Sequence, residues 1–389
     1  MVFFGIGCMS GSSLDGMDLC YVGFTEDSET ASWKYDILTA TTIPYNNEWR
    51  QKLQNANSLN GENLIRLHIE YGHYIGQTIA EFIQTENIVN LDFVASHGHT
   101  IFHQPNQGYT FQLGDGETTA VHLNQPFVCN FRNKDVALGG QGAPLVPNGE
   151  RYLFCDNDIC INLGGIANIG IKGSQGYDVC PCNYVSNKLA KTYNVHLEYD
   201  QNGEIAEKGT INHDILEQLD SLPFYKLSPP KSLGAEWIEA EVMPILNVVK
   251  YSIPDLLITY VEHITNRLVE SCMCARDALI QNSVREDTEA INKKILVTGG
   301  GAYNAFLMKV LESKLNANGL YLQKTDDRTI AFKEALIFAF LGLKCLLNQE
   351  NVLRTVTGSS QDSISGSIHR PACAAIQPPS IIRSLFDKK

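Results

Sequence analysis

The sequence predicts two α/β domains with a cleft between them, and three observations support this. Strand and helix signals alternate over all 389 residues, a length too great for one small core. A strand, a glycine-containing turn and a second strand begin the chain, and the same pattern returns roughly 150 residues later. Each of these starts is followed by helical patterns, as expected for layered α/β domains.

The N-terminal elements are predicted from local patterns. Val2–Met9 is rich in β-forming residues, runs into a Gly/Ser/Asp turn at Ser10–Gly16 and returns as Asp18–Phe24, so a hairpin is expected. Apolar residues in Asn63–Phe82 recur in steps of three and four, which predicts a helix. Leu91–Ala95 then reads as a short buried strand, and a polar loop at residues 96–100 is expected to follow it.

The pattern restarts at Ile159–Leu163, an apolar strand that turns at Gly164–Gly165 into a second strand, Ile166–Ile171. A short strand near residues 295–298 feeds three glycines. Long helices are expected at Pro254–Leu279 and Phe332–Leu347.

The domain boundary is expected between Arg132 and Arg151, with the glycine-rich stretch at residues 138–144 as a crossing loop. The predicted division is therefore 1–135 plus about 345–389 for the first domain and 136–344 for the second.

Composition restricts the class of function. The apolar fraction of 44% and charged fraction of 19% are typical of a globular protein. A formal net charge of −13 leaves no basic surface for nucleic acid or anionic membranes, so neither is an expected partner. No run of 18 apolar residues predicts a membrane span, and Met1–Met9 lacks the basic region of a signal peptide.

Cysteine usage points to a reduced, cytoplasmic protein. The 11 cysteines are dispersed rather than arranged as the framework of a short secreted chain. Several lie in apolar stretches, where a thiol behaves as a small hydrophobe, as for Cys8, Cys20, Cys129 and Cys345.

Three glycine-containing motifs are candidates for ligand binding. The turn from Met9 to Asp18 gathers Gly, Ser and Asp, which can direct N–H groups and hydroxyls at an anion while a carboxylate holds a cation. Such residues are equally those of any hairpin turn. Asn162–Ile169 and Val297–Phe306 allow the same close approach of backbone to a phosphate or nucleotide, although a lone glycine turn is a weak signal.

Titratable residues near these motifs have alternative interpretations. Asp178 precedes a predicted helix at Asn183–Ala190 and is a general base or a helix-capping residue. Glu334 near the start of a predicted apolar helix is interpreted as offsetting the helix dipole. The set His97, His99 and His103 favours polar loop contacts, such as to a substrate, over a metal site.

Taken in order, these motifs resemble the anhydro-N-acetylmuramic acid kinase family from residue 9 to about residue 371. The longest matching stretch, Phe131–Pro147, reads Phe-Arg-Asn-Lys-Asp-Val-Ala-Leu-Gly-Gly-Gln-Gly-Ala-Pro-Leu-Val-Pro. The other matching segments are residues 9–16, 96–100, 162–168, 229–234, 299–304, 333–339 and 356–358.

The resemblance implies an actin/hexokinase-like (ribonuclease H-like) α/β fold of two domains with ATP and Mg²⁺ in the interdomain cleft. It implies cleavage of the 1,6-anhydro bond of anhydro-N-acetylmuramic acid by water and phosphorylation of O6, in recycling of cell-wall sugars. Asp178 is at the family's base position. The sugar-binding residues implied are His97, Gly98, His99, Thr100, Arg132 and Glu334.

The resemblance also implies a nucleotide site and a magnesium site. Two carboxylates of the first turn, Asp15 and Asp18, are expected to support Mg²⁺. The nucleotide-binding residues implied are Gly11, Ser12, Ser13, Leu14, Asp15, Gly16, Met17 and Asp18 in the first turn, Gly164 and Gly165 in the second, and Gly299, Gly300 and Gly301 near the adenosine.

One segment departs from the family pattern. Where the family reads Tyr/Phe-Asp-Thr-Gly-Pro-Gly-Asn, this chain reads Tyr-Asp-Val-Cys-Pro-Cys-Asn at residues 177–183. A glycine with φ > 0 could be replaced by cysteine only at a cost of about 1–2 kcal/mol. His99 for the family's Gln and Ser12 for its Thr are further differences.

Three functions therefore stay open: the anhydro-sugar kinase, a kinase of the same fold acting on another amino sugar, and a non-catalytic sugar- or nucleotide-binding sensor. The expected partners are a small sugar and ATP. A homodimer is left open as the oligomeric state.

Overall fold

The computed structural model describes residues 1–11, 14–27, 32–171, 175–229, 231–282 and 294–372, which form two compact units. Unit 1 is Met1–Phe154 with Phe332–Lys389, and unit 2 is Cys155–Ala331. The division thus lies after residues 154 and 331, whereas residues 135 and 344 were expected from the sequence. The stretch 138–144, expected to cross between domains, lies within unit 1, where the N–H of Gln141 donates to Thr357 O at 2.8 Å.

Unit 1 is built on a six-stranded sheet in the order β13-β7-β4-β1-β2-β3. β1 (Val2–Ser10) pairs antiparallel with β2 (Gly16–Asp27), which confirms the predicted hairpin. The remaining strands are β3 (Ser32–Pro44), β4 (Phe93–Ser96), β7 (Phe127–Cys129) and β13 (Ser367–His369). β4 is parallel to β1, and β7 is parallel to β4.

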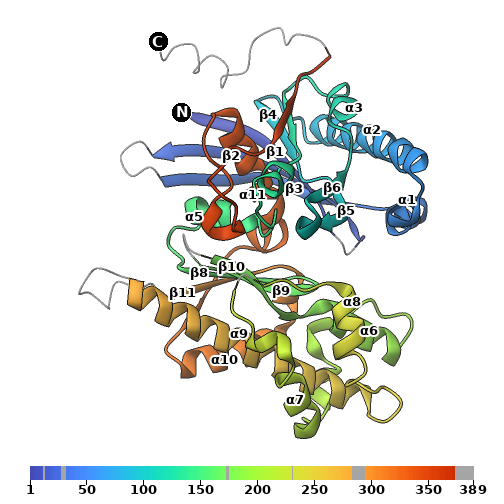
Figure 1. Cartoon of the computed structure of the whole chain (residues 1–389), viewed down its shortest axis with the longest axis vertical. Helices are drawn as coiled ribbons and strands as arrows, with labels where there is room; N and C mark the ends of the chain where they lie inside the picture. Colours follow the sequence, from blue (N-terminus) through green and yellow to red (C-terminus); the bar gives the residue numbers. More distant parts are fainter. Residues whose placement is uncertain (12–13, 28–31, 172–174, 230, 283–293, 373–389) are drawn as a thin grey trace. The chain divides into compact units, whose positions relative to one another are not determined.

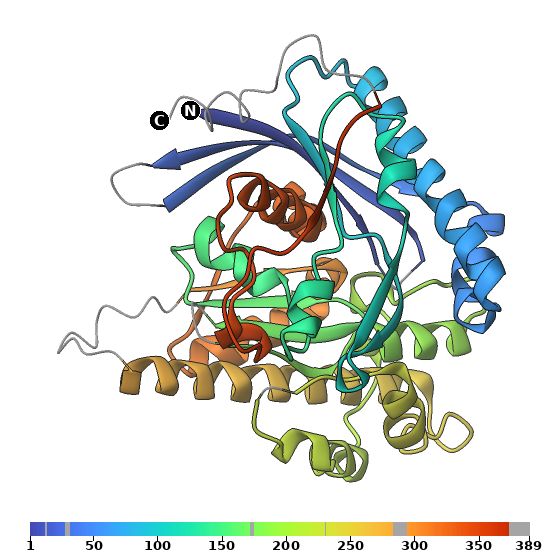
Figure 2. The ribbon, with the colours of Figure 1, turned by 45° about the horizontal axis from the view of Figure 1, so that its top comes forward.

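Helix α2 (Gly61–Thr85) covers one face of this sheet, and α3 (Gly116–Ala120) lies beside it (Figure 2). The predicted helix is confirmed, and the Asn60 side chain caps it by accepting from Asn63 N at 2.9 Å. Its apolar side packs with strand residues in a core that includes Ile6, Leu19, Tyr71, Ile75, Ile79 and Val94. The other helices of this unit are α1 (Asn47–Gln54), α4 (Asn133–Ala137), α5 (Val146–Leu153) and α12 (Arg354–Thr357).

Helix α11 (Asp327–Leu346) contains the second division between the units, and its part in unit 1 is almost wholly buried. A separate hairpin of β5 (His99–Gln104) and β6 (Tyr109–Leu113) follows β4. The polar loop expected over residues 96–100 is therefore reduced to His97 and Gly98.

The sheet of unit 2 has the order β10-β9-β8-β11-β12. Its strands are β8 (Ile159–Leu163), β9 (Ile166–Ile171), β10 (Gln175–Pro181), β11 (Lys294–Thr298) and β12 (Tyr321–Gln323). Numbered within each unit, five strands follow the same order, 3-2-1-4-5, with the second antiparallel and the fourth parallel to the first. This duplication agrees with the predicted actin/hexokinase-like (ribonuclease H-like) α/β class, which is confirmed.

Helix α9 (Ile253–Asn282) runs along unit 2 and packs against β10 and α10 (Figure 1). Predicted at Pro254–Leu279, this helix is confirmed. The other helices are α6 (Asn183–Tyr193), α7 (His213–Asp220), α8 (Ala235–Trp237) and α10 (Ala305–Ala317). Their apolar residues form a second core that includes Val185, Leu189, Leu256, Leu268 and Leu311. Among the described residues, no helix has the length and apolar character needed to cross a membrane.

Candidate active site

The predicted phosphate-binding turn joins β1 to β2 in unit 1. Ser12 and Ser13 lie outside the described residues. Leu14 has a φ of 57°, and Asp15 is exposed. An ideal Cβ on Gly16 would lie 2.6 Å from Ile43 O, so close packing against β3 already requires this glycine. Met17, expected among the nucleotide-binding residues, has its side chain fully buried in the core and can offer a ligand only its backbone.

Two carboxylates of this turn could provide oxygen ligands to a cation. Asp15 Oδ1 accepts from Gly16 N at 2.9 Å, and Asp18 Oδ1 accepts from Thr42 Oγ1 at 2.6 Å. Burial, together with the nearby charges of Asp15 and Glu334, raises the pKa of Asp18 to about 6, against the lowering effect of the Thr42 hydrogen bond. Carboxylates that repel one another in a partly buried place favour a bound cation, and oxygen is the ligand that Mg²⁺ prefers. The residues therefore fit the magnesium site expected here.

Arg132 lies next to His97 in unit 1. Its Nε donates to His97 Nε2 at 3.0 Å, and its Nη1 donates to Gly142 O at 2.6 Å. Because His97 Nε2 accepts, the ring proton must be on Nδ1, which lies 2.9 Å from Gly98 O. Burial and the Arg132 charge lower the pKa of His97 well below its usual value, so this imidazole is neutral.

Glu334 lies two turns inside α11, because the helix begins at Asp327 and not at Phe332. The predicted role in offsetting the helix dipole is therefore wrong. Burial raises the pKa of Glu334, while the positive charges of Lys333 and Arg132 lower it. Lys333 forms a buried ion pair with Glu150, with Nζ 2.6 Å from Oε1. Glu334 thus belongs to the same charged group as Arg132 and Asp18.

A chain of hydroxyl groups leads to His99. Tyr71 and Tyr45 hydroxyl oxygens lie 2.6 Å apart, Tyr45 donates to Ser10 Oγ at 2.7 Å, and Ser10 Oγ lies 2.9 Å from His99 Nδ1. Burial lowers the pKa of His99 to about 4, so it too is neutral near pH 7. His99 is thereby fixed at the end of β1, beside the first turn.

Between these two histidines, Gly98 adopts a φ of 71°, and an ideal Cβ there would lie 2.7 Å from Leu113 O. Thr100 accepts from Gln112 Nε2 at 3.3 Å. Gln112 Oε1 is buried and has no hydrogen-bond partner among the described residues, so an unused acceptor lies beside Thr100.

The three histidines of the H-x-H-x3-H pattern make separate polar contacts: His97 with Arg132, His99 with Ser10, and His103 Nδ1 with Thr110 Oγ1 at 3.1 Å. Within the part of the chain that the structure describes, no cluster of three or more His, Cys, Asp or Glu side chains could hold a metal ion, and the expected magnesium site has only two carboxylates.

In unit 2, Asp178 lies within β10 at a bulge. Its N–H donates to Lys231 O at 3.1 Å, and its Oδ2 accepts from Leu233 N at 2.9 Å. Burial raises the pKa of the Asp178 carboxyl to about 6, against the lowering effect of the Leu233 N–H. A carboxylate with this pKa accepts a proton readily at neutral pH.

The two cysteines after Asp178 are fully buried in the core of unit 2. Neither has a positive φ, and the φ of Cys182 is −128°. The backbone strain that a cysteine with a positive φ would have is therefore absent from these two positions. Burial raises the pKa of Cys180 well above its usual value and that of Cys182 to about 12, so both are inert thiols.

The second and third glycine motifs meet at the start of α6. Gly165 O accepts from Cys182 N at 2.8 Å, and Asn183 Nδ2 donates to Leu163 O at 2.8 Å. Gly299 has a φ of 87°, and an ideal Cβ there would lie 2.7 Å from Asn162 Oδ1. An ideal Cβ on Gly301 would lie 2.7 Å from Leu163 Cβ. Gly164–Gly165 and Gly299–Gly301 are thus brought together around the end of β8.

Sequence reasoning missed several residues that hold these groups in place. Lys231 and Leu233 hold Asp178, and their signal was the Pro229–Gly234 stretch, which matched the family without a role. Buried Asp135 accepts from Gly142 N at 2.7 Å and Thr357 Oγ1 at 2.6 Å, and it lay unused in the longest matching stretch. Tyr45 and Tyr71 carried no local signal.

Comparison with known proteins gives one consistent result. The chain matches the family described as anhydro-N-acetylmuramic acid kinase over residues 3–371. A protein of that name from Bacillus thuringiensis subsp. konkukian (strain 97-27) is 32% identical over 390 residues, covering 94% of this chain and 99% of the relative. Its namesake from Bacillus cereus (strain B4264) is 32% identical, with 95% and 97% covered.

Two solved structures are much less similar. The activator of the 2-hydroxyisocaproyl-CoA dehydratase from Clostridium difficile with bound ADPNP is 13% identical, with a TM-score of 0.35 and coverage of 88% and 96%. A ROK family protein from Streptococcus pneumoniae TIGR4 in complex with sucrose is 10% identical, with a TM-score of 0.31 and coverage of 88% and 100%. Scores at this level say nothing about activity.

This chain is similar over nearly its full length to proteins that share one name, and it is therefore an enzyme of the phosphotransferase class. More particularly, it belongs to the anhydro-N-acetylmuramic acid kinase family.

Proposed function

We propose that this enzyme uses ATP and water to convert 1,6-anhydro-N-acetylmuramic acid to N-acetylmuramic acid 6-phosphate, in peptidoglycan recycling. The observation that carries the proposal is Asp178, a partly buried carboxylate at the family's base position whose pKa is raised to about 6. Two backbone contacts, with Lys231 and Leu233, fix its place. A cytoplasmic location is part of the proposal, and the free state of the ten described cysteines supports it.

Asp178 is the proposed general base. It takes a proton from water as the water oxygen bonds to the anomeric carbon and the bond from that carbon to O6 breaks. The freed O6 then attacks the γ-phosphorus of ATP, and ADP leaves. The proton on Asp178 passes to solvent, so atoms and charge balance. A positioned base of this kind contributes typically 10²–10⁴-fold.

The charged and polar group of unit 1 is proposed to bind the sugar. Arg132 is suited to the substrate carboxylate because a guanidinium offers several donors in a fixed plane. Glu334 can accept from sugar hydroxyls. Neutral His97 and His99 hold their neighbours in place, and Gly98 and Thr100 line the same turn.

The glycine motifs are proposed to bind ATP. Gly11 with the rest of the first turn, Gly164–Gly165 and Gly299–Gly301 present backbone to phosphates and adenosine without intruding side chains. Asp15 and Asp18 would hold Mg²⁺, which offsets charge on the phosphates during phosphoryl transfer.

The decisive experiment compares Asp178→Asn with wild type in an assay for ADP and sugar phosphate from ATP, Mg²⁺ and the anhydro sugar. The amide is nearly isosteric but takes no proton, so we expect kcat to fall by about 100-fold or more with KM little changed. Asp200→Asn is the matched control, because the Asp200 carboxylate, like that of Asp178, accepts from backbone N–H groups: from Ile205 at 2.9 Å and from Ala206 at 3.0 Å.

A variant that keeps more than about a tenth of the wild-type kcat would exclude Asp178 as base. If wild type does not turn over the anhydro sugar but turns over another amino sugar in the same assay, that amino sugar is the substrate. Binding of ATP and sugar without any turnover would identify a sensor instead.

A further inference from the structure

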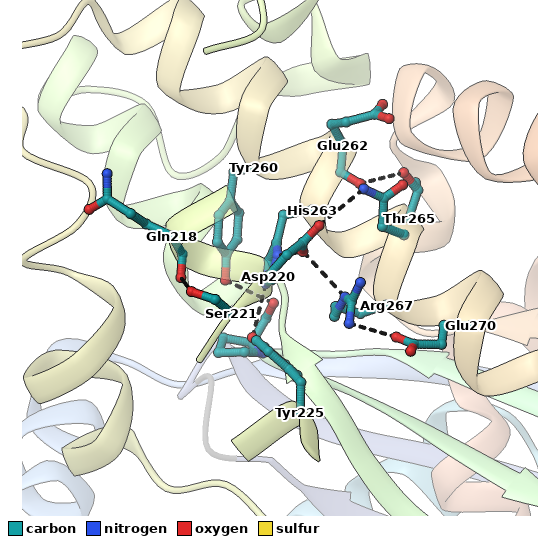
Figure 3. Close-up of polar contacts among 12 residues, drawn as sticks. Gln218, Asp220, Ser221, Tyr225, Tyr260, Glu262, His263, Thr265, Arg267 and Glu270 are labelled. Atoms are coloured by element: carbon teal, nitrogen blue, oxygen red, sulfur yellow. Dashed lines mark hydrogen bonds and ion pairs between the residues drawn. The ribbon is translucent and has the colours of Figure 1, made fainter. Parts of the chain in front are cut away.

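A buried histidine on α9 joins two other elements of unit 2 (Figure 3). His263 is completely buried. Its Nδ1 lies 2.6 Å from Asp220 Oδ1 at the end of α7, and its Nε2 lies 2.9 Å from the hydroxyl oxygen of Tyr225 in the short 3-10 helix η5 (Pro223–Lys226). Three segments that are distant in the sequence are thus joined by one imidazole.

The hydrogen bonds define one proton arrangement. The Asp220 carboxylate can only accept, so His263 Nδ1 donates to it. Burial lowers the pKa of His263, which keeps the ring neutral and leaves Nε2 as an acceptor. The Tyr225 hydroxyl must therefore donate to Nε2. Without that hydroxyl, the Nε2 lone pair would be buried and unsatisfied, which is costly.

Arg267, one turn further along α9, completes the arrangement. Its Nε lies 3.2 Å from Asp220 Oδ1 without hydrogen-bond geometry, and its Nη1 pairs with Glu270 at 2.6 Å. The guanidinium carbon lies 5.5 Å from the centre of the Tyr225 ring. Tyr225 is therefore held both at its hydroxyl and at its ring face, and η5 is fixed against α9.

From η5 the contacts continue to Asp178. Lys231 Nζ lies 3.4 Å from Phe224 O, 4.8 Å from the centre of the Phe224 ring and 5.8 Å from that of Tyr177. The backbone of the same lysine accepts the Asp178 N–H, and Leu233 N donates to the Asp178 carboxylate. The position of Leu233 N–H thus depends on where η5 lies.

We propose that Asp220, His263 and Tyr225 are positioning residues that fix η5 and, through Lys231, hold the Leu233 N–H on the Asp178 carboxylate. This inference rests on the proposed role of Asp178 as base. His263 has no exposed surface, so the Asp–His–Tyr arrangement is not a second reaction centre. Its function is to keep a donor on the base, which favours the charged form of the carboxylate.

Charged and titratable groups of the packed elements also face the β10 region, and each test variant changes only one of them. They are Tyr177, Cys180 and Cys182 on or beside the strand, Lys231 from the loop, Asp220 from α7, Tyr225 from η5, and Tyr260, His263, Arg267 and Glu270 from α9.

The test is Tyr225→Phe, which removes one hydroxyl and no charge. The carboxyl carbon of Asp178 is titrated by ¹³C NMR, with its signal identified by its loss in Asp178→Asn, and the pH profile of kcat is recorded in parallel. A weakened Leu233 N–H bond disfavours the carboxylate, so the Asp178 pKa should rise by about half a unit or more, and the acidic limb of the profile should move upward with it.

The matched control is Thr265→Val, which removes a buried hydroxyl from the same helix. Thr265 Oγ1 contacts Lys314 Nζ at 2.8 Å and α9 carbonyls, but not η5 (Figure 3). We expect no shift in its Asp178 pKa. Asp220→Asn is a second test variant, because the Asp220 side chain is 24% exposed and tolerates the change. The shift in its Asp178 pKa should have the same sign as that of Tyr225→Phe.

An upward shift in the test variants but not in the control supports the proposal. An unchanged Asp178 pKa in a folded test variant, or an equal shift in Thr265→Val, overturns it. The proposed function fails separately: if Asp178→Asn keeps its activity while the NMR shift is still observed, the positioning role stands and the base role falls.

Discussion

The carbonyl oxygen of Ala335 lies where a Cβ on Gly7 would stand, so α11 and the central strand β1 of unit 1 meet backbone to backbone. This contact fixes α11 at the residue next to Glu334. It thereby places Glu334 near Asp18, whose pKa responds to it. A glycine in a strand thus determines where a charged group of the candidate site lies.

Gly7→Ala should destabilise the protein by about 2 kcal/mol or more, because backbone atoms of α11 must move to admit the methyl group. The measurement is the urea midpoint of unfolding. Gly61→Ala is the control, since a Cβ there meets nothing within 4 Å at the start of α2, and it should be neutral or stabilise by up to about 1 kcal/mol. Equal effects of the two changes would contradict the packing argument.

Asp18→Asn should stabilise the protein at neutral pH and not at low pH, measured without Mg²⁺. Burial raises the Asp18 pKa from 3.8 to about 6, so the native state binds this proton more tightly than the unfolded state. In the wild type, the proton on Asp18 therefore contributes its full stabilisation of the native state below about pH 4, and this stabilisation is lost as the pH rises to about 6. The asparagine variant does not titrate, so its advantage should appear across that interval.

Urea unfolding at several pH values from about 4 to about 7, which spans the titration of this carboxyl, tests this. Asp36→Asn, at an exposed position of β3, is the control. If Asp18→Asn is less stable than wild type by the same amount at about pH 7 and about pH 4, the ionised Asp18 carboxylate does not lower the free energy of unfolding.

Local patterns in the sequence were sufficient for much of the fold. The β1–β2 and β8–β9 hairpins and helix α2 follow from periodicity and turn residues, which depend on neighbours in the chain. The start of α11 was misplaced because the apolar run was taken as the helix. Its true start has a capping signal: Asp326 Oδ1 accepts from Thr329 N at 3.0 Å. Because of that error, Glu334 was placed near the start of the helix and given a role in offsetting the helix dipole.

Local sequence patterns do not predict contacts between segments that are distant in the chain. Leu233 N–H on Asp178 joins residues 55 apart, and no periodicity reports that pairing. The same holds for His263, whose partners come from α7 and η5. The residue pattern left Asp178 as a general base or a helix cap, and only the resemblance favoured the base. Neither gave an account of how the carboxylate is held.

Removal of either carboxylate in the first turn should raise the Mg²⁺ requirement of the reaction. We expect Asp15→Asn and Asp18→Asn to need on the order of tenfold more Mg²⁺ for half-maximal rate, because affinity for a hard cation depends on the number of charged oxygen ligands. Titration of the rate with Mg²⁺ measures this, and Asp36→Asn again is the control. Unchanged titrations in both variants would assign the cation to other residues and leave this turn a structural role.

The cysteines after Asp178 should resist alkylation in the native protein. Cys180 and Cys182 are fully buried, and burial raises both pKa values, so iodoacetamide meets neither surface nor thiolate. Exposed Cys155 and Cys274 provide internal positive controls in the same mass-spectrometric digest. Labelling of Cys180 or Cys182 that the sugar blocks would instead place that thiol in the substrate pocket.

Restoring the family's glycines at these two positions should then impair the enzyme. Both side chains pack in the core of unit 2, beside Val179 and Val185, and their removal leaves cavities and adds backbone freedom to the strand that carries Asp178. We expect the double variant Cys180→Gly, Cys182→Gly to lose about 2 kcal/mol of stability per site and to have a lower kcat. Cys155→Gly, at an exposed turn, should change stability by less than about 1 kcal/mol. If the double variant has unchanged stability and a higher kcat, the two cysteine side chains impair the reaction and do not stabilise the core.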